Sequence, residues 1–236
     1  MLGPRQGGSL RDDPDESTPV PRTRLHEDAW RRDEAGPLKL FVTLTSPYVR
    51  VVRMAIAELG MTDRVEVVAV RTRVPDGEVN ALNPTGKVPT LMTGDGYILG
   101  ESRLICQYLD ALHTDDPIVD HDPAEADRQL EGVTTGFLDG IAVWLREQHR
   151  PANERSPGIL AQERARAERC LDWLEARPEL HADRLDYPRL CLFAALDALA
   201  GRLPFADWQQ RTPLLARWYA RVAQRPSALH TRAPDR

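Results

Sequence analysis

The chain has 236 residues, of which 42% are hydrophobic and 28% are charged, and its formal net charge is −5. This length and composition are typical of one large or two small soluble domains with a buried core. Nucleic-acid binding needs a concentrated basic face, and the arginines are scattered here, so we expect no nucleic-acid partner. No apolar stretch approaches the roughly 20 residues of a membrane-spanning helix, so we expect no membrane partner.

The cysteines and histidines are dispersed. Cys106, Cys170 and Cys191 are odd in number, lie far apart and form no CxxC pair. Such cysteines are typical of a reducing compartment, so we expect a cytoplasmic protein. The six histidines show no ligand spacing such as HxxxH, and we therefore expect no metal site.

Residues 1–37 differ from the rest of the chain. They are rich in Pro, Gly, Asp and Arg and have almost no apolar periodicity. Such a segment buries too little apolar surface to offset the entropy of the chain, so we expect a disordered tail. It is too acidic for a mitochondrial presequence and lacks the apolar core of a secretory signal. A start site assigned too far upstream would give the same pattern.

Order is predicted to begin at Leu38, where LKLFVTL has the composition of a short buried strand. Ser46 and Pro47 then precede an amphipathic run that ends at Gly60. A serine N-cap, a proline in the first turn and a glycine past the last turn predict a helix between them. VEVVAV (residues 65–70) predicts a second strand, which completes a strand–helix–strand unit.

The next part of the chain predicts two further strands and a helix. Residues 71–82 are polar and irregular, with room for one short helix. NPTGKVPTL (residues 83–91) introduces a third strand, although proline is restricted to sheet edges, strand starts and bulges and Pro89 stands where the strand should run. TGDGY predicts a tight hairpin turn to a fourth strand. GES at 100–102 then opens a helix over RLICQYLDAL.

From about residue 123 onward only the helical period of 3.6 residues is found. Four segments carry it and are bounded by Pro and Gly, which predicts an all-helical bundle: residues 123–148, 159–176, 188–203 and 214–230. Residues 113–122 form a polar linker. The predicted fold is therefore an α/β unit at 38–112, built as βαβ followed by ββα, and an all-α unit at 123–236.

Four motifs carry a family resemblance. They are SPYVRVVRMAIAELG from Ser46, NPTGKVPTL with its Val88-Pro89 pair, GES at 100–102, and PFADW with PLLARWYARVAQRPS near the C-terminus. Each is weak alone, but together they follow the order and distances of the cytosolic glutathione S-transferases, bacterial type, and the chain resembles this family from residue 38 to about 235. The resemblance implies a thioredoxin-like glutathione-binding domain, an all-helical substrate-binding domain and a homodimer.

The resemblance also implies a glutathione site. In the family the proline matching Pro89 is cis, which would turn the backbone of Val88 toward a peptide ligand; an ordinary edge-strand proline is the alternative. Ser102 would bind the γ-glutamyl carboxylate at a helix N-terminus, and Glu101 would face the α-amino group. A serine would cap a helix there in any protein, so the residue type alone does not distinguish a helix cap from a ligand-binding residue.

Three basic residues are further candidates for contacts with the peptide. Arg71 or Arg73 could meet the glycine carboxylate of glutathione, and Lys87 could border the same site. Solvated surface charge is the alternative for each of them.

Ser46 matches the position where related classes place a catalytic serine or cysteine. A serine hydroxyl and a helix N-terminus both favour the charged form of a thiol, whose usual pKa is about 8.5. Ser46 would therefore donate a hydrogen bond to the glutathione thiolate, with Thr45 as the second candidate. Because position 46 holds no cysteine, we do not expect reductase chemistry through a mixed disulfide. A plain helix cap is the alternative.

The function that the resemblance implies is that of a glutathione transferase, which activates the thiolate of its co-substrate glutathione for conjugation to a small electrophile, as in detoxification. One alternative is a non-catalytic binding or regulatory protein of the same fold. Another is a glutathione-dependent enzyme of ring opening, isomerisation or dehalogenation. The two enzymatic hypotheses share the glutathione site and differ in the substrate pocket of the second domain. Phe137, Ile141 and Trp144 are candidates for that pocket, although their helical spacing is more typical of a core.

One stretch departs from the family pattern. Family members often carry a Ser/Thr-x-x-Asp capping box before the core helix of the second domain, and the matching stretch here runs from Asp186 to Arg189. We expect Asp186 to cap this helix and Arg189 to offer no reciprocal acceptor.

Overall fold

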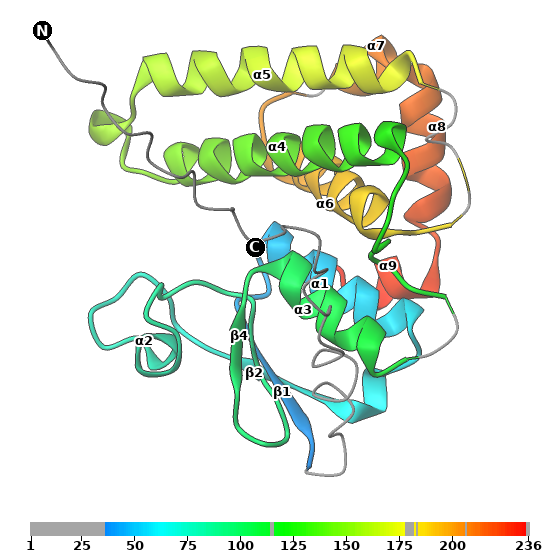
Figure 1. The fold of residues 1–236 in the computed structure, drawn as a ribbon. Coiled ribbons are helices and arrows are strands. Elements are labelled where there is room, and N and C mark those ends of the chain that lie inside the picture. Colours follow the sequence, from blue (N-terminus) through cyan, green and yellow to red (C-terminus); the bar gives the residue numbers. More distant parts are fainter. Residues whose placement is uncertain (1–35, 114–115, 178–181, 183, 206, 235–236) are drawn as a thin grey trace, which may run out of the picture.

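The computed structural model describes residues 36–113, 116–177, 182, 184–205 and 207–234. The tail predicted at 1–37 therefore lies outside the described residues except for its last two positions. The described chain forms a sheet with two helices against it, and a layer of long helices lies beyond these (Figure 1).

The first half is a four-stranded sheet with helices. Its elements follow the predicted order: β1 (Leu38–Val42), α1 (Pro47–Glu58), β2 (Val65–Ala69), α2 (Glu78–Leu82), β3 (Thr90–Met92), β4 (Ile98–Gly100) and α3 (Ser102–Ala111). The strand order is β2-β1-β3-β4, with β1 parallel to β2 and the other pairs antiparallel. This is the thioredoxin-like βαβ-ββα arrangement that the sequence predicts.

Side-chain alternation along β1 explains how the sheet meets its helices. Leu38, Leu40 and Val42 are almost fully buried, whereas Lys39 is partly exposed and forms an ion pair with Glu66 of β2 at 3.3 Å. Successive side chains of a strand point to opposite faces, so the three apolar residues share one face. Figure 1 shows α1 and α3 side by side between the sheet and the long helices.

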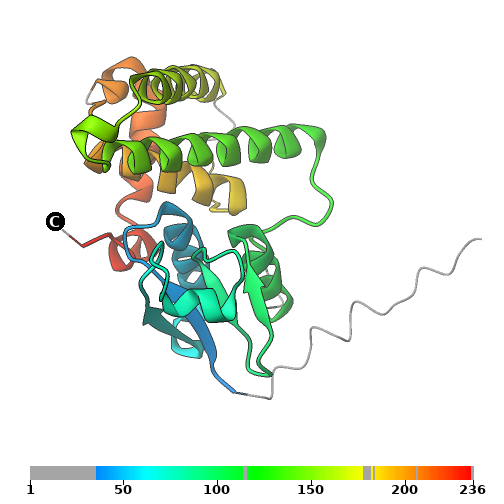
Figure 2. The same ribbon diagram turned by 90° about the vertical axis from the view of Figure 1, so that its left-hand side faces the viewer.

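The second half is helical, as the sequence predicts. Its elements are α4 (Glu125–Gln148), α5 (Pro157–Glu175), α6 (Tyr187–Arg202), α7 (Trp208–Arg211), α8 (Pro213–Val222) and α9 (Pro226–His230). Both ribbon views show α5 and α4 stacked over α6, with α6 next to the sheet-bearing half (Figures 1 and 2). Nearly every residue of α6 is buried, because α4, α1 and α8 all pack against it. No helix in the described part of the chain is long and apolar enough to cross a membrane.

A buried ion pair joins the two halves. The Arg50 guanidinium of α1 pairs with the Asp197 carboxylate of α6 and also donates to the carbonyl of Ala228 at 3.1 Å. Asp197 accepts a second hydrogen bond from the Tyr219 hydroxyl at 3.1 Å, and Arg50 lies over the Phe193 ring. Burial lowers the pKa of Arg50, and the Asp197 carboxylate opposes that change.

The segment predicted as a polar linker is fastened to both halves. The Asp110 carboxylate at the end of α3 accepts hydrogen bonds from the backbone N–H groups of Ile118 (2.8 Å) and Val119 (2.7 Å). The carbonyl of Ile118 accepts from the backbone N–H of Tyr187 at 2.8 Å. Ile118 and Val119 are buried, so this stretch contributes to the core although most of its residues are polar.

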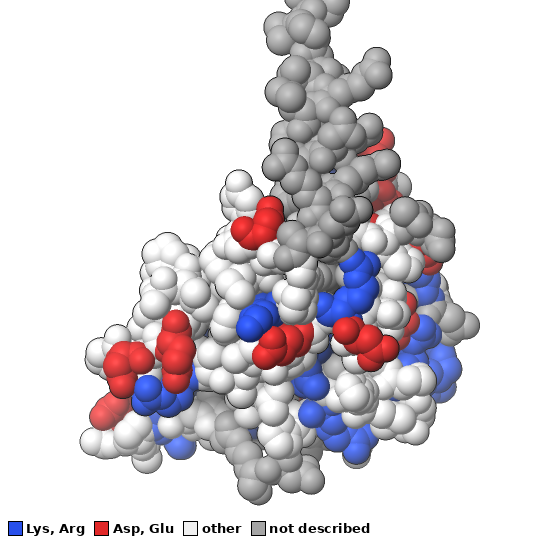
Figure 3. Space-filling model, turned by 90° about the horizontal axis from the view of Figure 1, so that it is seen from below, with Lys and Arg blue, Asp and Glu red and all other residues white. Residues whose placement is uncertain are grey.

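Charges on the surface are mixed in sign. Figure 3 shows acidic and basic side chains of the described residues interspersed over the face seen from below. Near α2 the mixture reflects ion pairs, because Arg71 lies 3.2 Å from Asp76 and 3.4 Å from Glu78.

Candidate functional site

A cleft of about 770 Å³ lies between the sheet-bearing half and α4. Loops of the first half supply one wall, and α4 with the end of α6 supplies the other. Eight of the nine residues predicted for the glutathione site line this cleft, and Arg71 does not: Thr45, Ser46, Arg73, Lys87, Val88, Pro89, Glu101 and Ser102.

Ser46 is the N-cap of α1, with Pro47 in the first turn. Its hydroxyl oxygen accepts a hydrogen bond from the backbone N–H of Val49 at 3.4 Å, and its backbone N–H donates to the carbonyl of Thr43 at 3.0 Å. A cap uses a lone pair of the hydroxyl oxygen and leaves the hydroxyl proton available. The same side chain can therefore cap the helix and donate a hydrogen bond into the cleft.

The Val88-Pro89 peptide bond is cis, as the family resemblance implies. A chain of side-chain hydrogen bonds holds the turn before β3. The Asn83 amide donates to the Thr90 hydroxyl at 2.9 Å, and that hydroxyl donates to the carbonyl of Lys87 at 2.8 Å. Asn83 and Thr90 are buried, so this turn is fixed from inside the protein and Val88 borders the cleft.

Glu101 and Ser102 lie where β4 meets α3. Glu101 precedes the helix with a φ of 64°, in the left-handed region that side chains other than glycine rarely adopt. Its carboxylate is largely exposed and lies 3.8 Å from the ammonium of Lys87. Ser102 is the first residue of α3, and its hydroxyl lies 2.9 Å from the Tyr187 hydroxyl. Free N–H groups at this helix start favour an anion.

The two candidate arginines in the loop after β2 have different positions. Arg71 pairs with Asp76 and Glu78 and does not line the cleft. Arg73 lines the cleft and has a φ of 61°. Of the two arginines, Arg73 therefore borders the cleft, whereas Arg71 pairs with acidic residues outside it.

The second wall of the cleft carries no motif that predicts it. From α4 the cleft is lined by Asp139, Ala142, Val143, Leu145, Arg146 and His149. The Tyr48 hydroxyl donates to the Asp139 carboxylate, which joins α1 to α4 across the cleft. Burial and Asp139 raise the pKa of Tyr48, whereas the guanidinium of Arg146 opposes that rise.

The pocket candidates that the sequence analysis named on α4 lie elsewhere. Phe137, Ile141 and Trp144 are 1–3% exposed and belong to the hydrophobic core, so they contact neighbouring helices and do not line the cleft. Their apolar spacing in the sequence marks the side of α4 that faces the core. The cleft-facing stripe at 139, 142–143, 146 and 149 has the same helical spacing but mixes charged, small and aromatic side chains.

Arg202 at the end of α6 also reaches the cleft. Its guanidinium donates to the carbonyl of Thr45 at 2.5 Å. The second half of the chain therefore holds the loop that carries both candidate hydroxyls, Thr45 and Ser46, in place.

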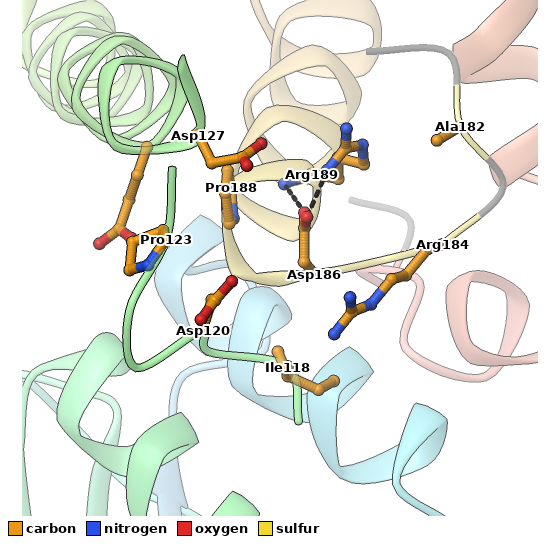
Figure 4. A pocket seen from close by; sticks show the side chains of 10 residues that line it. Ile118, Asp120, Pro123, Asp127, Ala182, Arg184, Asp186, Pro188 and Arg189 are labelled. Atoms are coloured by element: carbon orange, nitrogen blue, oxygen red, sulfur yellow. Dashed lines mark hydrogen bonds and ion pairs between the residues drawn. The ribbon is translucent and has the colours of Figure 1, made fainter. Parts of the chain in front are cut away.

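A smaller cavity of about 230 Å³ lies at the start of α6. Figure 4 shows that Asp186 caps α6 there by accepting from the backbone N–H of Arg189 at 3.1 Å, while the Arg189 guanidinium pairs with the same carboxylate. Asp186 thus caps the helix as expected. Arg189 offers no acceptor to the cap and instead pairs its positive charge with the Asp186 carboxylate. Arg184 pairs with Asp116 at 2.9 Å, so both arginines at this cavity form ion pairs within the protein.

In the described part of the chain, no group of three or more His, Cys, Asp or Glu side chains could hold a metal ion. The cysteines are free, and burial raises the pKa values of Cys106, Cys170 and Cys191. A thiol with a raised pKa is poorly nucleophilic, so none of the three offers a reactive thiolate.

Comparison with known proteins identifies the family. Residues 40–117 match the model for the glutathione S-transferase N-terminal domain. A glutathione transferase family member from Pseudomonas fluorescens Pf-5, solved with bound glutathione, is 33% identical, with a TM-score of 0.77 and coverage of 84% of this chain and 100% of that one. The chain belongs to the glutathione S-transferase family.

Other members of the glutathione S-transferase family agree with this assignment. A glutathione S-transferase from Methylobacillus flagellatus KT, solved with glutathione bound, is 30% identical, with a TM-score of 0.75 and coverage of 84% of this chain and 100% of that one. The uncharacterized GST-like protein YibF of Escherichia coli (strain K12) is 29% identical over 202 residues, which cover 84% of this chain and 99% of YibF. Family membership thus extends over both halves of the fold.

Proposed function

We propose that this chain is a glutathione transferase of the type with a serine at the active-site position, in which Ser46 stabilises the glutathione thiolate for attack on a small electrophile. The observation that carries the proposal is the convergence of Ser46, Val88, Glu101 and Ser102 on one cleft. These residues come from three separate segments, and together they offer a hydroxyl donor, a free backbone edge, a carboxylate and a helix N-terminus. Glutathione needs a partner of each kind.

The proposed binding mode assigns one part of glutathione to each group. The γ-glutamyl carboxylate lies at the N-terminus of α3, where it receives the N–H and hydroxyl of Ser102. Its α-amino group faces Glu101, and its cysteinyl backbone pairs with Val88 as an added strand. The glycine carboxylate meets Arg73, and Lys87 borders the site.

Ser46 is proposed as the thiolate donor in preference to Thr45. Its hydroxyl lies at the N-terminus of α1, where the helix dipole adds to the stabilisation of a negative charge. The Thr45 hydroxyl precedes the cap and has no helix behind it. With Ser46 as the donor, a smaller fraction of the bound thiol is protonated at neutral pH.

Several broader features belong to the same proposal. Residues 38–112 would form the glutathione-binding domain and residues 123–236 the substrate-binding domain of a cytoplasmic homodimer without a metal. A second crystal structure of the Pseudomonas fluorescens protein, again 33% identical over 84% of this chain, holds S-(propanoic acid)-glutathione. By analogy, the cleft here would have room for a group on the glutathione sulfur.

Turnover of chlorodinitrobenzene separates an enzyme from a binding protein. We expect glutathione-dependent formation of the thioether, with a rate that is saturable in glutathione and exceeds the uncatalysed rate. The measurement is the absorbance of the conjugate at neutral pH. Saturable glutathione binding without turnover would favour the non-catalytic alternative, and release of halide without a stable conjugate would favour dehalogenation.

A further inference from the structure

The cleft carries an excess of positive charge in an acidic protein. The whole chain has a formal net charge of −5, yet the charged residues that line the cleft include four cations and two carboxylates. The cations are Arg73, Lys87, Arg146 and Arg202, and the carboxylates are Glu101 and Asp139. A concave surface of one dominant sign concentrates ligands of the opposite charge.

Most of these charged groups have partners in the protein. Glu101 lies 3.8 Å from Lys87, and Asp139 accepts the hydrogen bond of the Tyr48 hydroxyl. Arg202 donates to the carbonyl of Thr45. Among the described residues, neither carboxylate forms an ion pair with the remaining two cations, Arg73 and Arg146.

Arg73 and Arg146 approach each other from opposite walls. Burial and the nearby Arg146 guanidinium lower the pKa of Arg73. Among the described residues, no hydrogen bond or ion pair with the protein is found for either guanidinium. Both side chains are exposed, so water screens part of their repulsion, and an anion bound at this end of the cleft would offset the rest. Glutathione supplies one such anion, its glycine carboxylate, and Arg73 lies in the loop assigned to it.

Arg146 is better placed for the second substrate. It follows Ala142 and Val143 by one helical turn on the cleft face of α4, so a small apolar surface adjoins its guanidinium. Its positive charge also acts on Tyr48, two residues beyond Ser46. An anion on Arg146 would therefore lie near the position of the glutathione sulfur, with its apolar body against α4.

We propose that the electrophilic co-substrate carries a carboxylate, which Arg146 binds while the reactive carbon faces the sulfur. This inference rests on the proposed function. For an aryl chloride, glutathione first loses its thiol proton to solvent. The thiolate electron pair then forms the carbon–sulfur bond, and chloride leaves with the electrons of the carbon–chlorine bond. Arginine suits this task because its planar guanidinium can donate two parallel hydrogen bonds to one carboxylate.

A matched pair of electrophiles tests the proposal. Chlorodinitrobenzoate, with chlorine para to the carboxylate and between two nitro groups, is compared with the corresponding neutral carboxamide. Each kcat/KM is divided by the uncatalysed rate constant with glutathione, which removes the difference in intrinsic reactivity. We expect the wild type to prefer the carboxylate, and Arg146→Gln to lower that preference up to about fivefold, the effect of losing an ion pair at an exposed site.

Two control variants make the result specific. Arg128→Gln removes one positive charge from the other end of α4, where Arg128 pairs with Asp122 and does not line the cleft, so the preference should stay at the wild-type value. Arg146→Lys should restore part of the preference, because it keeps the charge and loses the planar donor pair.

The possible outcomes separate this proposal from the proposed function. An unchanged preference in Arg146→Gln would overturn the role of Arg146 while the transferase function stands. An equal fall in kcat/KM for both electrophiles, with a higher KM for glutathione, would assign Arg146 to glutathione and also overturn it. If neither electrophile is turned over although chlorodinitrobenzene is, this inference fails and the transferase function stands. If chlorodinitrobenzene is not turned over either, the proposed function fails, and this inference fails with it.

Discussion

Replacing Ser46 with alanine is expected to lower kcat/KM for glutathione conjugation about 10- to 100-fold, because a hydrogen bond to a charged group is worth about 1.5–3 kcal/mol. The same change should raise the apparent pKa of the bound glutathione thiol, because the thiolate loses a donor while the thiol loses little. The pH dependence of kcat/KM measures this pKa. The loss of activity should therefore be larger at pH 6.5 than at pH 9, where the thiol is ionised without help.

The chain contains a matched control for the loss of the helix cap. Ser156 also precedes a proline at the start of a helix, α5, and its hydroxyl accepts from the backbone N–H of Ile159 at 3.3 Å. Ser156→Ala and Ser46→Ala should each lower the free energy of unfolding by about 0.5–2 kcal/mol, but Ser156→Ala should keep wild-type activity. Full activity in Ser46→Ala together with its loss in Thr45→Ala would contradict the role given to Ser46.

Replacing Asp197 with alanine is expected to lower the free energy of unfolding by about 3–5 kcal/mol, because it leaves the buried Arg50 guanidinium without its partner. The Arg50 side chain is 7% exposed, so water cannot replace the lost carboxylate easily. The Tyr219 hydroxyl loses its acceptor in the same variant. Urea denaturation followed by tryptophan fluorescence measures the change.

An exposed ion pair of the same kind provides the comparison. Asp172 pairs with Arg211 at 2.5 Å on the surface, where the two side chains are 54% and 42% exposed. Asp172→Ala should lower the free energy of unfolding much less than Asp197→Ala, because water screens an exposed pair and replaces the lost partner. If Asp197→Ala cost no more than Asp172→Ala, the Arg50–Asp197 pair would not be what holds α1 against α6.

Much of the fold could be predicted from local signals. Ser46 and Pro47 mark the start of α1, and the alternation in LKLFVTL marks β1, because caps and periodicity act within a few residues. The helix predicted from residue 159 begins at Pro157 in the structure. Ser156 and Pro157 repeat the punctuation of α1, so the signal for the earlier start was present in the sequence.

The cleft divides into a part that the sequence predicted and a part that it did not. Ser46, Val88 and Ser102 came from motifs whose order and spacing resemble the family. The hydrogen bond from Tyr48 to Asp139 joins positions 91 residues apart and exists only because α4 packs beside α1. No local pattern encodes such a contact. For the same reason the apolar stripe of Phe137 and Ile141 was easier to detect than the cleft-facing side of α4.

The position of Ser46 is compatible with both interpretations of this residue, a helix cap and a hydrogen-bond donor to a thiolate. Its oxygen accepts from the backbone N–H of Val49, so it is a helix cap, and it lines the cleft with its hydroxyl proton free to be donated. The helix terminus that needs a cap is also the terminus that favours a thiolate. Structural and catalytic roles are therefore compatible at this position.

The measurement that tests the central claim most directly is a calorimetric titration of the wild-type protein with glutathione. The proposed site predicts saturable binding with one molecule per chain and a Kd of about 1 mM or lower, which corresponds to a binding free energy of about −4 kcal/mol or more favourable. Ser102→Ala should weaken this binding, because the γ-glutamyl carboxylate loses a donor. A folded wild-type protein that shows no saturable heat with glutathione would contradict the account.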